Sequence, residues 1–177
     1  KAFAGTPVGN NSLCSNIDTT LNLNDLISNE DLGGKWSVVP NVAGLNGNSF
    51  KTKGIPVGTY NFYYTLSGKP TAPPCEGDTT NVSLTINLSP VADAGADNFI
   101  SCKQSVVNLG GKSTNDPAFN YLWTSPNGGI ANSPTSLFTT TNLKGTYVLK
   151  ISNKTSGCFA VDTVNVSEMK TKPKIAL

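Results

Sequence analysis

Gly145-Thr146-Tyr147-Val148-Leu149-Lys150-Ile151 is the stretch that decides the fold of this chain. Its large apolar side chains at 147, 149 and 151 alternate with side chains of the opposite face. Alternation with period 2 over this length predicts an antiparallel β-strand that is buried on one side. The first half of the chain contains the counterpart Gly58-Thr59-Tyr60, which opens a run with the matching inward row Tyr60, Phe62, Tyr64 and Leu66. The same strand is therefore present twice.

Other landmarks repeat in the same order around these two strands. They are Ala4-Gly5 and Ala94-Gly95, Cys14 and Cys102, Trp36 and Trp123, Cys75 and Cys158, and the phrases Asp78 to Ser83 and Asp162 to Ser167. Self-similarity of this kind is typical of an array of modules. We expect one repeat over residues 1–89, a second over 90–169, and a linker or the start of a further repeat over 170–177 of a longer mature array.

Strand signals dominate each repeat. In the second copy the candidate strands are Phe99–Cys102, Val106–Leu109, Tyr121–Ser125, Ser136–Thr141, the run from Gly145, and Ala160–Val166, and they are separated by turns rich in Gly, Asn and Pro. Around seven short strands in about 80 residues, with one Trp near the middle, is the pattern of an immunoglobulin-like sandwich. We therefore predict an all-β chain of two tandem immunoglobulin-like β-sandwich domains, with only a short helical turn around residues 24–28.

Composition argues against several classes of function. The 177 residues include no histidine, and all 13 basic residues are lysine. Without histidine the chain lacks the usual proton shuttle of neutral pH and the imidazole metal ligand, and without arginine it lacks the bidentate clamp for phosphate. A net charge of +2 argues against nucleic acid as a partner. No nucleophile motif and no apolar run of membrane-spanning length are present, so we expect neither an enzyme nor direct membrane insertion.

The four cysteines fall at matched places, two in each repeat. In a small chain rich in Gly, Pro and Thr this favours one disulfide per module, Cys14–Cys75 and Cys102–Cys158, and hence export to an oxidising compartment. Only this pairing of the three available ones treats both copies alike. The expected bridge would join the first strand to the last hairpin at one end of each sandwich.

The second copy resembles the repeats of polycystic-kidney-disease-like and SprB type in secreted Bacteroidetes surface proteins. The phrases that carry the resemblance are Val91–Asp97, the Cys102 strand, Tyr121–Thr124, Leu143–Ile151 and Ser156–Val164. The match covers nearly all of residues 91–168 and is looser over 1–89. The resemblance implies a cell-surface or extracellular location, as part of a gliding-motility adhesin or other cargo of the type IX secretion pathway.

Two kinds of polar site are candidates for chemistry. Asp93 and Asp97 lie at the junction of the repeats and could supply part of a site for calcium, the one cofactor that the sequence suggests, although both also fit a solvated linker. The Asp-Thr steps at Thr19, Thr79 and Thr163 fit the O-glycosylation pattern that the Bacteroidetes resemblance implies. They fit equally an Asp-Thr that opens a strand with its Thr facing solvent.

Aromatic side chains were the third candidate, because exposed rings can bind sugars. Alternation places most of them in the core and leaves Phe50, Tyr63, Phe99, Phe138 and Phe159 for the surface. The function that we predict is a structural stalk or spacer of an exported adhesin or filament, with neighbouring repeats, surface glycans or other surface proteins as partners. The alternative is a carbohydrate-binding or accessory module of a secreted hydrolase.

Overall fold

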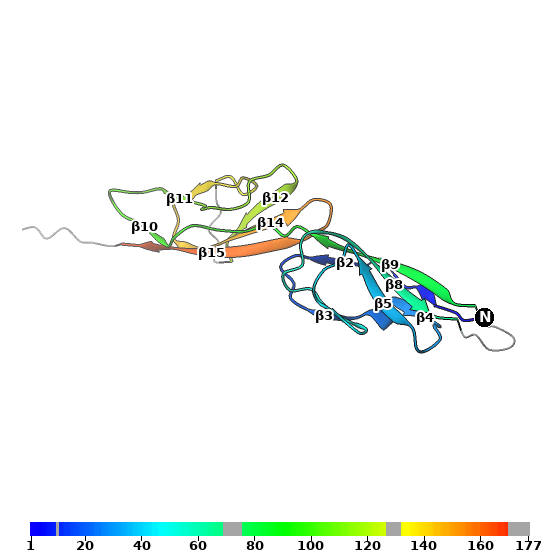
Figure 1. The fold of residues 1–177 in the computed structure, drawn as a ribbon. Coiled ribbons are helices and arrows are strands. Elements are labelled where there is room, and N and C mark those ends of the chain that lie inside the picture. Colours follow the sequence, from blue (N-terminus) through cyan, green and yellow to red (C-terminus); the bar gives the residue numbers. More distant parts are fainter. Residues whose placement is uncertain (10, 69–75, 127–131, 170–177) are drawn as a thin grey trace, which may run out of the picture. The chain divides into compact units, whose positions relative to one another are not determined.

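The computed structural model describes residues 1–9, 11–68, 76–126 and 132–169. The chain divides into two compact units, Lys1–Leu88 and Ser89–Leu177. Both units are built from β-strands and turns (Figure 1). The predicted further repeat over 170–177 lies outside the described residues.

Unit 1 pairs its strands in two main sheets. The first has the order β2-β9-β8-β5 and the second the order β3-β7-β6, while β1 pairs with β4. The elements are β1 (Thr6–Pro7), β2 (Asn11–Cys14), β3 (Thr20–Asn22), β4 (Ile27–Ser28), β5 (Lys35–Val39), β6 (Leu45–Asn46), β7 (Ser49–Lys51), β8 (Gly58–Leu66) and β9 (Asp78–Asn87). The predicted short helical turn is a 3₁₀ turn, η1 (Leu23–Leu26), capped by the Asn22 side chain.

Unit 2 repeats this plan. Its four-stranded sheet consists of β10, β15, β14 and β12 in that order (Figure 1). A second sheet pairs β11 with β13. The elements are β10 (Asn98–Ile100), β11 (Val107–Leu109), β12 (Phe119–Thr124), β13 (Thr139–Thr141), β14 (Gly145–Asn153) and β15 (Phe159–Glu168). In both units the first strand of the large sheet runs parallel to the last, and the other pairs are antiparallel. This is the strand order of an immunoglobulin-like sandwich, as predicted.

Each unit has its own core. In unit 2 the inward rows of the sheets bury Val107, Leu109, Phe119, Trp123, Tyr147, Leu149, Ile151, Val164 and Val166. In unit 1 the row predicted on β8 is buried, with Phe62 fully enclosed, and Trp36 packs partly buried against it. The core positions that alternation predicted on β8 and β14 are confirmed.

A buried tyrosine fixes the start of the penultimate strand in both units. The hydroxyl of Tyr60 donates to the carbonyl of Pro56 at 2.7 Å, and that of Tyr147 donates to the carbonyl of Leu143 at 2.9 Å. The Tyr147 hydroxyl also lies 2.6 Å from the Thr141 hydroxyl. The bond from the ring back to a carbonyl just upstream is the tyrosine corner of immunoglobulin-like folds.

Replacing Tyr147 with Phe should destabilise unit 2 by about 1–3 kcal/mol, because the change leaves the Leu143 carbonyl and the buried Thr141 hydroxyl with fewer partners. Urea unfolding followed by Trp123 fluorescence measures the loss. Tyr63→Phe, followed by Trp36 fluorescence because Tyr63 lies in unit 1, is the control, since Tyr63 is a half-buried tyrosine on the outward face of β8. Equal effects of the two changes would show that the corner bond contributes nothing specific.

Candidate functional site

The leading end of each unit, where the chain enters it, is fastened by one aspartate. The Ala4 N–H donates to Asp78 Oδ2 at 2.8 Å, and the Ala94 N–H donates to Asp162 Oδ2 at 2.7 Å. Both alanines are fully buried, and the glycine after each has a positive φ. At Gly5, with φ of 84°, a Cβ would also lie 2.9 Å from a backbone carbonyl oxygen. The repeated Ala-Gly pair and the repeated Asp-Thr step thus form one structural contact.

The trailing end, where the chain leaves each unit, lies at the opposite end of the last strand. Because β2 runs parallel to β9, Cys14 at the end of β2 lies beside Asn87 at the end of β9. Because β10 runs parallel to β15, Ile100 likewise lies beside Glu168. The ten residues of β9 span about 30 Å. Each unit therefore receives the chain at one end and releases it at the other.

This topology overturns the predicted Cys102–Cys158 disulfide. Cys102 follows β10 at the trailing end of unit 2, whereas Cys158 precedes β15 at the leading end, so most of the length of β15 separates them. A disulfide needs Cα atoms within about 7 Å. Cys102 is accordingly an exposed free thiol, while Cys14 and Cys158 are each disulfide-bonded. Cys75, the other half of the predicted Cys14–Cys75 bridge, lies outside the described residues.

Asp93 has a structural role that its sequence context did not indicate. Its carboxylate accepts hydrogen bonds from the Gly95 N–H at 2.9 Å and the Lys112 N–H at 2.6 Å. Its backbone N–H donates to the Ser113 hydroxyl, which donates to the Asp93 carbonyl in return. A Cβ at Gly111 would lie 2.3 Å from the carboxylate, so this position has room only for glycine. Asp93 fastens the chain before β10 to the turn after β11.

The two aspartates of the predicted calcium pair, Asp93 and Asp97, accept hydrogen bonds from different backbone N–H groups. Asp97 uses its carboxylate elsewhere, accepting the Asn165 N–H at 2.8 Å. Among the described residues, no group of three or more Asp, Glu, His or Cys side chains could hold a metal ion. Both aspartates instead bind backbone N–H groups of their own unit, and calcium at Asp93 and Asp97 stays a prediction.

The carboxylates of Asp78 and Asp93 should make the protein sensitive to acid. The hydrogen bond from the Gly95 N–H, followed by that from Lys112, holds the pKa of Asp93 below its usual value, and the Ala4 N–H lowers the pKa of Asp78. A lowered folded-state pKa contributes stability that is present above the unfolded-state value and is lost as pH falls through the folded-state pKa. We expect the free energy of unfolding to fall below pH of about 4. Asp93→Asn should flatten this dependence; parallel pH profiles of variant and parent would contradict the assignment.

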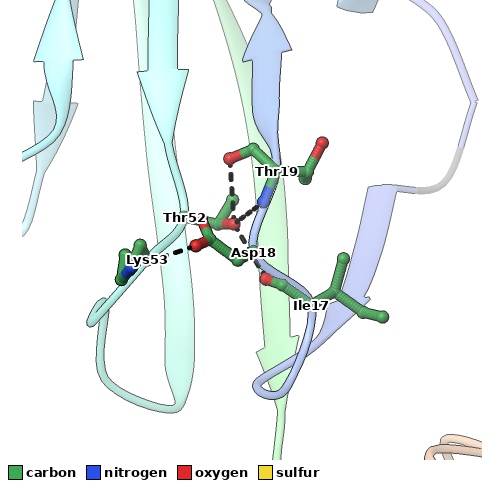
Figure 2. A network of polar contacts seen from close by, with 5 residues as sticks. All are labelled: Ile17, Asp18, Thr19, Thr52 and Lys53. Carbon is green, nitrogen blue, oxygen red and sulfur yellow. Dashed lines mark hydrogen bonds and ion pairs between the residues drawn. The ribbon is translucent and has the colours of Figure 1, made fainter.

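A second polar contact holds two loops of unit 1 together (Figure 2). The buried hydroxyl of Thr52 accepts the Thr19 N–H at 3.0 Å and lies 3.0 and 3.1 Å from the carbonyl oxygens of Ile17 and Thr19. Beside it, Lys53 Nζ lies 3.4 Å from Asp18 Oδ2, with both side chains largely in solvent. An exposed ion pair of this kind contributes little to the free energy of unfolding. The hydrogen bonds of the Thr52 hydroxyl are therefore the contacts that hold the two loops together.

Thr52→Val keeps the shape of this side chain and removes its hydrogen bonds. We expect unit 1 to lose about 1–3 kcal/mol, because the Thr19 N–H and the Ile17 carbonyl then lack their partner, whereas the Thr19 carbonyl keeps the Thr52 backbone N–H. Asp18→Ala, which removes the neighbouring ion pair, should cost less than about 0.5 kcal/mol. Urea unfolding followed by Trp36 fluorescence compares the two variants, and a larger loss for Asp18→Ala would reverse the ranking.

The three predicted glycosylation threonines differ in their surroundings. Thr79 on β9 and Thr163 on β15 are exposed, and Thr19 is partly buried with its backbone bound to Thr52. The aspartate before Thr79 and the one before Thr163 are the fastening groups at the leading ends, which explains these Asp-Thr steps structurally. Modification of the three threonines stays a prediction.

The predicted surface aromatics do not form one platform. Phe50 is fully buried and packs edge-on against Phe62 with ring centroids 4.8 Å apart, so its predicted exposure was wrong. Phe99, Phe138 and Phe159 are exposed on different elements or loops of unit 2. A shallow groove in unit 1 is lined by Trp36, Tyr64 and neighbouring polar residues, but both rings belong to the core.

Nothing in the described residues resembles a membrane span: the structure has no helix of the length and apolarity that crossing requires.

Comparison with known proteins gives likeness of fold only. No family model matches the chain, and no curated protein matches its sequence.

Extracellular domains 3–5 of Drosophila OTK are 14% identical with a TM-score of 0.47, covering 96% of this chain and 62% of that one. The N-terminal four Ig domains of Dscam1 isoform 9.44 are 14% identical with a TM-score of 0.39, covering 96% and 46%. Domains 1–6 of the surface layer protein SbsC are 17% identical with a TM-score of 0.28, covering 78% and 20%. The chain thus spans less than two thirds of each of these structures, and its own strand order identifies it as two immunoglobulin-like domains.

Proposed function

We propose that this chain is a structural segment of an extracellular protein, in which immunoglobulin-like modules in series act as a spacer. The observation that supports it is the parallel pairing of β2 with β9 and of β10 with β15. This pairing places the leading and trailing ends of a module at opposite ends of its last strand. A module with this topology adds length between whatever is joined to its two ends.

The same pairing suits a module that is pulled by its ends. Tension would draw β2 and β9 along each other in opposite directions, because the force enters through one and leaves through the other. The backbone hydrogen bonds between the two strands are then stretched together and do not break one after another. The contacts of Ala4 with Asp78 and of Ala94 with Asp162 resist the same displacement.

An extracellular location is supported by the disulfide-bonded state of Cys14 and Cys158, because such bonds persist in oxidising compartments. The resemblance of residues 91–168 to SprB-type repeats supports the finer assignment to a Bacteroidetes surface adhesin exported by the type IX pathway. In that assignment the work of the segment is mechanical and not enzymatic, and its partners are neighbouring repeats and surface molecules. Protease accessibility on intact producing cells, with and without the export pathway, tests it.

Stretching single molecules by their two ends tests the spacer role. A reductant keeps all cysteines as thiols, so only non-covalent contacts resist. We expect two separate unfolding events, each releasing the length of one unit, about 300 Å for the 88 residues of Lys1–Leu88. Gradual extension without discrete events would rule out the mechanical role.

A further inference from the structure

Cys14, Cys102 and Cys158, the cysteines in the described part of the chain, occupy two kinds of position. Cys14 and Cys102 each lie at the trailing end of their unit, at or just after the strand that runs parallel to the last strand. Cys158 lies at the leading end of unit 2, directly before β15. One trailing-end cysteine and one leading-end cysteine are disulfide-bonded, and the other trailing-end cysteine, Cys102, has a free thiol.

The fold of unit 2 excludes a bond between its own two cysteines. Ile100, near Cys102, lies beside Glu168, whereas Cys158 is next to Phe159 at the other end of β15. The ten residues of β15 span about 30 Å, far more than the roughly 7 Å that separates the Cα atoms of a disulfide. A partner for Cys102 must therefore come from outside its unit.

The local structure presents Cys102 to such a partner. A tight turn carries it, in which the Ser101 N–H donates to the Gln104 carbonyl at 2.9 Å and the Gln104 N–H donates to the Ser101 carbonyl at 3.1 Å. Two apolar side chains of the neighbouring strand ends, Phe99 and Met169, are 40% and 46% exposed. Apolar surface at the end of a module is suited to contact with another module.

We propose that Cys102 forms a disulfide with a leading-end cysteine of another module of this kind. Such a cysteine precedes the last strand of its module, as Cys158 precedes β15 in unit 2. The second observation behind this proposal is Cys14, the trailing-end cysteine of the other repeat, which is disulfide-bonded. The inference does not depend on the mechanical function. In a series of these modules it adds to the polypeptide a covalent bond between the module that carries Cys102 and the one that follows it.

The bond forms by thiol–disulfide exchange with a small-molecule disulfide or a disulfide oxidoreductase. The Cys102 thiolate attacks the oxidant's disulfide, making a mixed disulfide and releasing one thiol. The thiolate of the leading-end cysteine then attacks the Cys102 sulfur and releases the second thiol. The two cysteines lose two electrons and two protons in total, and the oxidant gains them as two thiols.

A polypeptide in which a second full chain follows the first tests the proposal with an internal control. The Cys102 of the first copy then precedes a module, and the Cys102 of the second copy does not. The polypeptide is folded in a glutathione redox buffer, labelled with a thiol reagent and digested before aspartate, which places the four cysteines of a copy in different peptides. Ser105→Ala in the second copy marks its Cys102 peptide by mass.

The expected result is a first-copy Cys102 peptide joined to the peptide of a cysteine that precedes the last strand of a module, and a second-copy Cys102 that is labelled. Protection of the first thiol should exceed that of the second at least tenfold. Equal labelling of the two would overturn the proposal. So would bonds that join Cys102 only to glutathione or to Cys102 of another molecule, because they indicate adventitious oxidation of an exposed thiol.

Discussion

Phe62→Ala should unfold unit 1 at a far lower urea concentration and leave unit 2 unaffected. Phe62 is fully buried in the centre of β8, and its ring packs edge-on against Phe50 with centroids 4.8 Å apart. Truncating a buried Phe to Ala costs about 3–5 kcal/mol, through lost burial and the cavity that remains. With a urea dependence of about 1–1.5 kcal/mol per molar for a unit of this size, the midpoint should fall by roughly 2–5 M.

The chain offers a separate probe for each unit. Trp36 is in unit 1 and Trp123 in unit 2, so Trp123→Phe and Trp36→Phe backgrounds report the two transitions independently. Leu149→Ala is the reciprocal variant, since Leu149 is fully buried in the core of unit 2. It should shift the Trp123 transition and spare that of Trp36. If either substitution moved both transitions together, the two cores would not be independent.

Alternation along the sequence was sufficient to predict the strands and the inward rows of β8 and β14. The same local signal also found the tyrosine that opens each strand, because period 2 depends only on neighbours along one segment. It failed at Phe50, whose strand β7 has three residues. A strand this short offers too few positions for alternation to show which face is buried.

Contacts between distant segments were beyond this kind of reasoning. The repeated Ala-Gly pairs and Asp-Thr steps were recognised as landmarks, yet their joint role depends on Ala4 meeting Asp78 and Ala94 meeting Asp162. The cysteines were assigned by symmetry between repeats, which does not specify the direction in which strands pair. Parallel pairing of the first and last strands separates Cys102 from Cys158, and it is equally what gives each unit two opposite ends.

The parallel pair of unit 1 should lose much of its mechanical resistance in Leu13→Pro. The Ser15 N–H donates to the Asn87 carbonyl at 2.8 Å. N–H groups along a strand point alternately toward and away from the partner, so the Leu13 N–H faces Thr85 of β9 and the Ser12 N–H points away. Proline at 13 removes a ladder donor and a partly buried side chain, a loss of roughly 2–4 kcal/mol. Single-molecule stretching in reductant should show one of the two unfolding forces falling, with the other unchanged.

Two further variants separate the ladder bond from the other effects of the substitution. Ser12→Pro places the same ring in the same strand, but its lost N–H lies on the open edge of the sheet, since β2 is an edge strand among the described residues. Leu13→Ala removes the side chain and keeps the N–H. If the ladder between β2 and β9 carries the force, Leu13→Pro weakens unit 1 well beyond either control. Equal weakening by Ser12→Pro would mean that backbone distortion, and not the parallel ladder, sets the resistance of the module.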